Sequence, residues 1–168
     1  MKDNPRLNVR HVRGKNPVRI ILDGRFRCHP SSRVFSNARI ERPIIVTSRR
    51  YAQAQQQKRN TLVRKGVRIF ELDTHREDGR LVLKNVLATL ATLGLSSVLV
   101  EGGASLFSGM MNEHLADRIE CFIAPKIYSS GLDAFRGIRH PGRGFLFLNV
   151  SFQRFADDIL VKGTLANS

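Results

Sequence analysis

Short apolar runs alternate with longer amphipathic stretches along the first two thirds of the chain. Residues 18–23 (VRIILD), 42–48 (RPIIVTS) and 67–72 (VRIFEL) are rich in β-branched residues and predict three strands. Residues 49–65 are polar and rich in good helix formers, and Gly66 follows where a helix C-cap is expected. This part of the chain therefore predicts a helix between the second and third strands.

The pattern continues with a second helix and two more strands. Residues 80–94 predict a helix, because apolar residues recur on one helical face before Gly94; they are Leu83, Val86, Leu87, Leu90 and Leu93. Residues 96–101 (SSVLVE) predict a buried fourth strand, residues 104–114 a helix, and residues 118–127 a fifth strand. Residues 150–166 alternate on both sides of Ala-Asp-Asp and predict an antiparallel hairpin.

These elements define an α/β fold class. Strands and helices that alternate through short connections predict parallel pairing with right-handed crossovers. We therefore expect a mixed, mainly parallel sheet flanked by helices, with a C-terminal antiparallel hairpin. A length of 168 residues predicts a single domain over residues 1–168.

Composition limits the compartment and the cofactors. No apolar run approaches the roughly 20 residues of a membrane span, and the N-terminus has no apolar signal region. A cytoplasmic protein is therefore predicted. Cys28 and Cys121 have no ligand spacing to each other or to histidine, so neither a disulfide framework nor a metal site is expected.

Positive charge is concentrated in the first half of the chain. Residues 1–80 carry 20 basic and 7 acidic side chains, a balance of +13, whereas residues 81–168 carry 8 and 7, a balance of +1. Such a half attracts anions, either nucleic acid or phosphorylated small molecules. A solvated basic surface explains the same composition, so charge alone does not choose among these readings.

Residues 98–109 (VLVEGGASLFSG) hold the strongest candidate chemistry. A strand, a glycine pair and a helix start form the geometry of an anion site, because the free N–H groups of the first helical turn point at the ligand. Glycine also lets the backbone approach that ligand closely. The alternative is a tight strand-to-helix turn that requires glycine only for steric reasons. Glu101 either faces a polar ligand or interacts with the N-terminus of the next helix.

Three ordered segments make the resemblance specific. The segments KDNPRLNVR (2–10), NPVRIILDGRFRCHP (16–30) and VLVEGGASLFSGMMNEHLADRIECFIAPKI (98–127) resemble the reductase domain of the bifunctional riboflavin-biosynthesis deaminase/reductase. That domain is dihydrofolate-reductase-like in fold. The resemblance implies that NADPH delivers hydride to C1′ of 5-amino-6-(5-phosphoribosylamino)uracil, giving the ribitylamino product of riboflavin biosynthesis. It also implies that the chain forms a homodimer and acts on a phosphorylated pyrimidine substrate.

The resemblance assigns roles to matching residues. It implies that Leu7, Arg10 and Glu101 bind substrate, with Arg10 on its phosphate, and that Asp3 lies near the cofactor. The alternatives are that Arg10 is only a surface cation and that Asp3 with Asn4 and Pro5 is only a turn signal. It further implies that the backbone from Gly103 to Gly109 cradles the cofactor pyrophosphate. The expected cofactor-binding run is Gly102, Gly103, Ala104, Ser105, Leu106, Phe107, Ser108 and Gly109.

The chain departs from the family pattern at two places. Gly24 stands where the family often has a serine that contacts the cofactor, and only the backbone of Gly24 could replace that contact. The family's domain also carries a strand and a helix before the first motif, which are expected to be absent here. We further expect Arg25 to bind the 2′-phosphate of NADPH, because it follows a strand end and Arg–phosphate bonds are charge-assisted. The alternative is that Arg25 is a solvated surface residue.

Two other functions remain open at this point. One is a catalytically impaired remnant of the reductase, and the other is a small basic nucleic-acid-binding protein. The second is favoured by the 21 arginines, but aromatics are only 7% of the residues and no RRM, KH or helix-turn-helix pattern is recognisable. No residue is assigned as proton donor.

Overall fold

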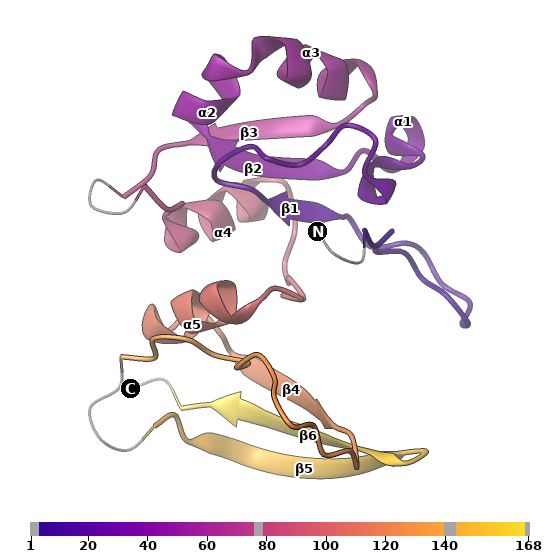
Figure 1. The fold of residues 1–168 in the computed structure, drawn as a ribbon, viewed down its shortest axis with the longest axis vertical. Helices are drawn as coiled ribbons and strands as arrows, with labels where there is room; N and C mark the ends of the chain where they lie inside the picture. Colours follow the sequence, from indigo (N-terminus) through magenta and orange to yellow (C-terminus); the bar gives the residue numbers. More distant parts are fainter. Residues whose placement is uncertain (1–3, 76–78, 140–143, 167–168) are drawn as a thin grey trace. The chain divides into compact units, whose positions relative to one another are not determined.

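The computed structural model describes residues 4–75, 79–139 and 144–166 (Figure 1). The chain divides into two compact units, Met1–Leu90 and Ala91–Ser168. Each unit has a three-stranded sheet of its own, parallel in the first and antiparallel in the second. Asp3 belongs to the residues that lie outside the described part.

The first unit is built on a parallel sheet of order β1-β2-β3. Its strands are β1 (Ile20–Leu22), β2 (Ile44–Ser48) and β3 (Arg68–Leu72), and all three lie within the stretches predicted as strands. Ile20 pairs with Ile44, and Ile44 pairs with Arg68. Every residue of the central strand β2 is buried, as its continuous apolar run predicts for a parallel strand.

The connections of the first unit contain short helices. The residues between β1 and β2 form η1 (Arg33–Phe35) and α1 (Ala38–Glu41), neither of which the sequence predicts. The predicted helix 49–65 is divided into α2 (Arg49–Ala54) and α3 (Gln56–Arg64), because Gln55 leaves the helical region with φ −123° and ψ 48°. Gly66 follows with φ +97°, which confirms its place as a glycine stop. The predicted helix 80–94 is observed as α4 (Leu83–Thr92).

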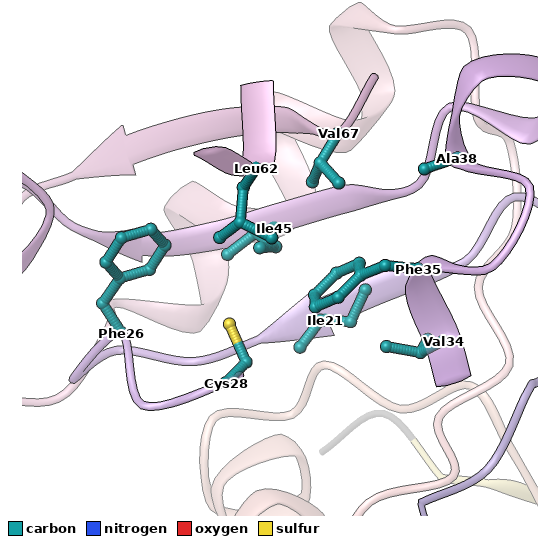
Figure 2. Packing of buried hydrophobic residues seen from close by; sticks show 9 residues of the cluster. All are labelled: Ile21, Phe26, Cys28, Val34, Phe35, Ala38, Ile45, Leu62 and Val67. Carbon is teal, nitrogen blue, oxygen red and sulfur yellow. The ribbon is translucent and has the colours of Figure 1, made fainter. Parts of the chain in front are cut away.

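One apolar cluster covers a face of the parallel sheet. Figure 2 shows Ile45 of β2 next to Leu62 of α3, and Ile21 of β1 next to the ring of Phe35 of η1. The remaining members are Phe26, Cys28, Val34, Ala38 and Val67. Phe26 and Cys28, which follow β1, belong to this cluster. Their packing anchors the loop that carries Gly24 and Arg25.

The second unit is an antiparallel sheet with one helix. Helix α5 (Ala104–Asn112) precedes β4 (Arg118–Ile123), and β5 (Phe147–Phe155) and β6 (Asp158–Leu165) form the predicted hairpin. The strand order is β4-β6-β5, so β6 is central and the other two are edges. The pairing of β5 with β6 shifts register between Leu148 and Ser151.

The prediction of a buried strand over residues 96–101 is wrong. These residues form neither helix nor strand, and Val98 and Leu99 are 37% and 78% exposed. In the described part of the chain the sheets consist of β1–β3 and β4–β6, and no ladder includes this segment. A strand requires a partner for its backbone N–H and C=O groups, and an apolar sequence alone does not provide one.

The α/β class with a parallel first part and an antiparallel C-terminal hairpin is confirmed. The parallel and antiparallel strands lie in separate sheets, since no strand forms over residues 96–101 to extend the parallel one. Across the described residues, no helix is both long and apolar enough to cross a membrane.

Candidate functional site

An N-terminal arm, defined here as residues 4–10, carries two of the predicted substrate residues. Leu7 has φ +51° and packs against the apolar cluster of the first unit. Arg10 is exposed at the end of the arm. The arm is held along its length, for example where the Arg33 N–H donates to the Asn4 Oδ1 at 2.9 Å. Leu7 is thus anchored, and the exposed position of Arg10 allows it to meet a solvent-borne anion.

The loop after β1 is organised by Asp23. Its carbonyl accepts hydrogen bonds from the Phe26 N–H at 2.8 Å and the Thr47 hydroxyl at 2.7 Å. Its carboxylate accepts the Cys28 N–H at 2.6 Å. These bonds turn the chain sharply, so Phe26 is fully buried while Arg25 is exposed. A side chain at Gly24 would meet only Leu81, at 3.5 Å, so the fold itself does not require glycine there.

A further arginine adjoins this loop, and the sequence reading did not single it out. The Ser48 N–H donates to the Gly24 carbonyl at 3.3 Å, which brings the end of β2 beside the end of β1. Arg49 follows directly, exposed, with its Nε 3.5 Å from the Asp73 carboxylate after β3. The sequence could have indicated Arg49, because this residue directly follows the predicted strand 42–48 and parallel strands end at the same edge of a sheet.

The Cys28 thiol in this loop has low reactivity. Burial, reinforced by the Asp23 carboxylate, raises the pKa of the Cys28 thiol from its ordinary 9.0 to about 12. The nucleophile in cysteine chemistry is the thiolate, so this thiol is protected at neutral pH. Cys121, in contrast, is exposed on β4.

Alkylation should separate the two thiols. At pH 8 the native chain should take up one iodoacetamide label, on Cys121, and Cys28 should react only after unfolding. Because the raised pKa belongs to the folded state, the unfolded chain loses the thiol proton first. Stability from Cys28 should therefore fall as pH rises from about 9 towards 12. Peptide mass spectrometry and a Cys28→Ser comparison across that pH range test this, and rapid labelling of native Cys28 would contradict it.

The second unit holds the glycine pair at the start of α5. Gly103 is the N-cap, with φ −92° and ψ 177°, and among the described residues no side-chain hydrogen bond caps the helix. A Cβ at Gly103 would meet nothing within 4 Å, whereas one at Gly102 would lie 2.6 Å from Leu106 Cδ2. Gly102 therefore allows the turn to pack on the helix, and Gly103 leaves open space in front of the first turn. The fold requires small size only at Gly102.

The remaining face of α5 is occupied by the chain itself. Ser108 is buried, and its Oγ accepts the Arg136 N–H at 2.7 Å. The ring of Phe107 lies 6.1 Å from that of Phe135. The Asn112 side chain bonds both Gly137 and Arg139. Of the predicted run Gly103–Gly109, the exposed positions are thus Gly103 and Ser105, with Ala104 half-buried between them.

Glu101 lies two residues before the N-cap and is exposed. It does not cap α5, since the described part of the chain shows no side-chain hydrogen bond at that helix N-terminus. The interpretation of Glu101 as a partner of the helix N-terminus therefore has no hydrogen bond to support it. Within the second unit, the structure brings Glu101 and the open turn of α5 together in sequence and in space. Within the first unit, it brings together Gly24, Arg25 and Arg49 at one sheet edge.

These features define a class of protein: an α/β domain in which a parallel βαβ unit is followed by an antiparallel sheet. The chain belongs to the RibD C-terminal domain family, because the model of that family matches residues 1–155. It is similar to the riboflavin biosynthesis protein RibD of Aquifex aeolicus, with 37% identity over 133 residues, 79% of this chain and 34% of that protein. It is also 31% identical to the 2,5-diamino-6-ribosylamino-4(3H)-pyrimidinone 5′-phosphate reductase of Methanothermobacter thermautotrophicus, over 80% of this chain and 58% of that protein.

Solved structures show the same fold. The chain resembles Acinetobacter baumannii RibD with a TM-score of 0.77 and 23% identity, over 98% of this chain and 44% of that one. It resembles the diaminohydroxyphosphoribosylaminopyrimidine deaminase/5-amino-6-(5-phosphoribosylamino)uracil reductase of Thermotoga maritima with a TM-score of 0.73 and 30% identity, over 98% and 42% of the two chains. The chain thus spans about a third of the length of the RibD protein from Aquifex aeolicus. The predicted family resemblance is confirmed.

Proposed function

We propose that this chain is an NADPH-dependent reductase that converts 5-amino-6-(5-phosphoribosylamino)uracil into its ribitylamino product in riboflavin biosynthesis. The observation that carries the proposal is the uncapped N-terminus of α5 with open space before Gly103, inside a chain that belongs to the RibD C-terminal domain family. Relatives named as reductases of this pathway support the same chemistry.

The residues fit a dinucleotide phosphate. The backbone N–H groups of the first turn of α5 would receive the pyrophosphate, because an uncapped helix N-terminus attracts anions. Gly103 and Ser105 would face it, and Gly102 would keep the turn close to the helix. Arg25 would bind the 2′-phosphate, with the neighbouring backbone of Gly24 in contact with the cofactor and Asp3 near it. NADPH supplies the hydride.

The substrate would be held by its phosphate and its polar groups. Arg10 would pair with the 5′-phosphate and Leu7 would hold the substrate through its backbone, while Glu101 would accept hydrogen bonds from the uracil-ribose portion. These roles demand only binding and orientation, as expected where the cofactor carries the chemistry. Because the family model spans residues of both units, we infer that residues 1–168 act as one reductase domain. We also propose that it acts in the cytoplasm.

Ligand titration and turnover test the proposal. The purified chain should bind NADPH in the micromolar range and oxidise it only when the phosphorylated substrate is present. NADH titrated in parallel measures the preference for the 2′-phosphate. An oligonucleotide titrated over a salt series should show no steep salt-dependent affinity. NADPH binding without turnover would identify an impaired remnant, and steep salt-dependent DNA binding without NADPH binding would identify a nucleic-acid-binding protein; either overturns the proposal.

We also propose that the chain forms a homodimer through the second unit. Ile123, Phe152 and Ile159 are 52%, 72% and 47% exposed on one face of its sheet, since Ile159 pairs with Ile123 and Phe152 pairs with Val161, two residues along β6. An open groove of about 950 Å³ lies there, lined by Pro125, Lys126 and residues 152–159. Large apolar side chains gathered on one surface mark an interface. The occupant proposed is a second copy, because residues 81–168 carry a balance of only +1 and two copies can approach there without the repulsion of the basic half.

A charged residue in that groove should separate the copies. Phe152→Glu should leave a folded monomer, with the dimer dissociation constant raised about thirtyfold or more, as for loss of an interface residue worth about 2 kcal/mol. Val63→Glu is the matched control, because Val63 is an exposed apolar residue on α3 of the other unit. Sedimentation equilibrium measures the constant. A wild-type chain that is monomeric, or an unchanged constant in Phe152→Glu, would contradict the proposal.

A further inference from the structure

The N-terminal arm is fixed by a hydrogen-bonded network of Asn16, Arg19 and Glu41, to which the sequence assigned no role. The Val9 N–H, next to Arg10, donates to the Asn16 Oδ1 at 2.9 Å. The Asn16 Nδ2 donates in turn to the Glu41 Oε1 at 2.7 Å. Asn16 is exposed and 25 residues distant from Glu41 in sequence, so this link is a tertiary contact and not a local turn.

A second link reaches the other side of Leu7. The Arg19 guanidinium donates to the Arg6 carbonyl at 3.2 Å, to the Ser36 carbonyl at 2.9 Å and to the Glu41 Oε2. The Arg19 side chain is 1% exposed and that of Glu41 is 22% exposed. One carboxylate, Glu41, therefore receives both links. The two links clamp the arm at Arg6 and at Val9, on either side of Leu7.

The clamp explains how Leu7 keeps an uncommon conformation. Leu7 has φ +51°, a left-handed value that costs an L-residue free energy and persists only where its surroundings impose it. The packing of Leu7 on the apolar cluster and the bonds at Arg6 and Val9 impose it here. The backbone of Val9 also determines where the next residue, Arg10, begins.

We propose that Asn16 is a positioning residue: through its bond to Val9, supported by Glu41, it sets the place of Arg10 for the substrate phosphate. This inference rests on the proposed function, since it takes Arg10 as the phosphate ligand. Asn16 acts on the Arg10 end of the arm, and Arg19 acts on the Leu7 end. Loss of Asn16 should therefore weaken recognition of the phosphate more than recognition of the rest of the substrate.

The test compares two substrates in the full chain. Asn16→Ala should raise the KM for the phosphorylated substrate about three- to tenfold, the effect of one hydrogen bond of about 0.5–1.5 kcal/mol. The KM for the analogue that lacks the phosphate should change less than twofold, and kcat and the NADPH dissociation constant should stay unchanged. Asn16→Asp keeps the acceptor for the Val9 N–H and should lie between wild type and Asn16→Ala.

Controls separate positioning from stability and from the proposed function. Asn60→Ala removes an exposed asparagine from α3 and should match wild type in both KM values. Arg10→Ala combined with Asn16→Ala should be no worse than Arg10→Ala alone, because Asn16 acts through Arg10. Equal losses with both substrates, or additive losses in the double variant, would overturn the inference while leaving the reductase proposal standing. A wild-type chain that neither binds nor reduces the substrate overturns both.

Discussion

Gly103→Asp should make the protein slightly more stable and at the same time strongly weaken its affinity for NADPH. Gly103 is the N-cap of α5, has extended backbone angles and has no atom within 4 Å of an added Cβ. An aspartate there can accept a free N–H of the first turn, and such a cap is worth roughly a few tenths of a kcal/mol over glycine. The same carboxylate would occupy the site proposed for the pyrophosphate and repel it.

The expected loss of affinity is large. Each charge-assisted hydrogen bond contributes about 1.5–3 kcal/mol, so replacing the phosphate at this turn should raise the NADPH dissociation constant about a hundredfold or more. Gly131→Asp is the matched control, because Gly131 also has open space around it and introduces the same charge elsewhere in the second unit. Fluorescence titration and thermal unfolding measure both quantities. Higher stability with unchanged NADPH affinity would show that the pyrophosphate does not bind at α5.

The sequence predicted those elements whose signal is local. The apolar runs of β1–β3 and the alternation in the hairpin of β5 and β6 led directly to the observed strands. Residues 96–101 show the limit of such reasoning. Val98, Leu99 and Val100 have strand composition, but pairing depends on a neighbouring backbone that a composition does not specify. The helix break at Gln55 could not be predicted either, since neither glycine nor proline lies between α2 and α3.

The candidate site divides in the same way. The motif from Glu101 to Gly109 could be read from the sequence, because a glycine pair before a helix has a direct physical meaning. The hydrogen bond between Ser108 and Arg136 could not be predicted from the sequence, since the two residues are 28 positions apart. The roles of Asn16, Arg19 and Glu41 could not be predicted for the same reason, although Asn16 and Arg19 lie in a segment that carries the family resemblance. Each is an ordinary polar residue until the fold brings it to the arm.

Glu41→Ala should cause the largest loss of stability among single polar substitutions in the first unit. Arg19 is 3% exposed and has no solvent to replace the Glu41 carboxylate. Removing one partner of a buried ion pair leaves an uncompensated charge, which costs about 3–5 kcal/mol. For a chain of this size that corresponds to a fall in melting temperature of about 6–20 °C. Far-UV circular dichroism measures it, since the chain has no tryptophan.

The double variant Arg19→Met with Glu41→Leu should recover most of that loss. Apolar residues of similar volume remove both desolvation costs, and such replacements of buried pairs are often neutral or stabilising. Asp73→Ala is the matched control. It breaks the Arg49–Asp73 pair, whose side chains are 57% and 84% exposed, and should change the free energy of unfolding by less than about 0.5 kcal/mol. If Glu41→Ala were as mild as Asp73→Ala, the Arg19 charge would have to reach water in the folded state. The arm clamped by Arg19 would then be open in solution.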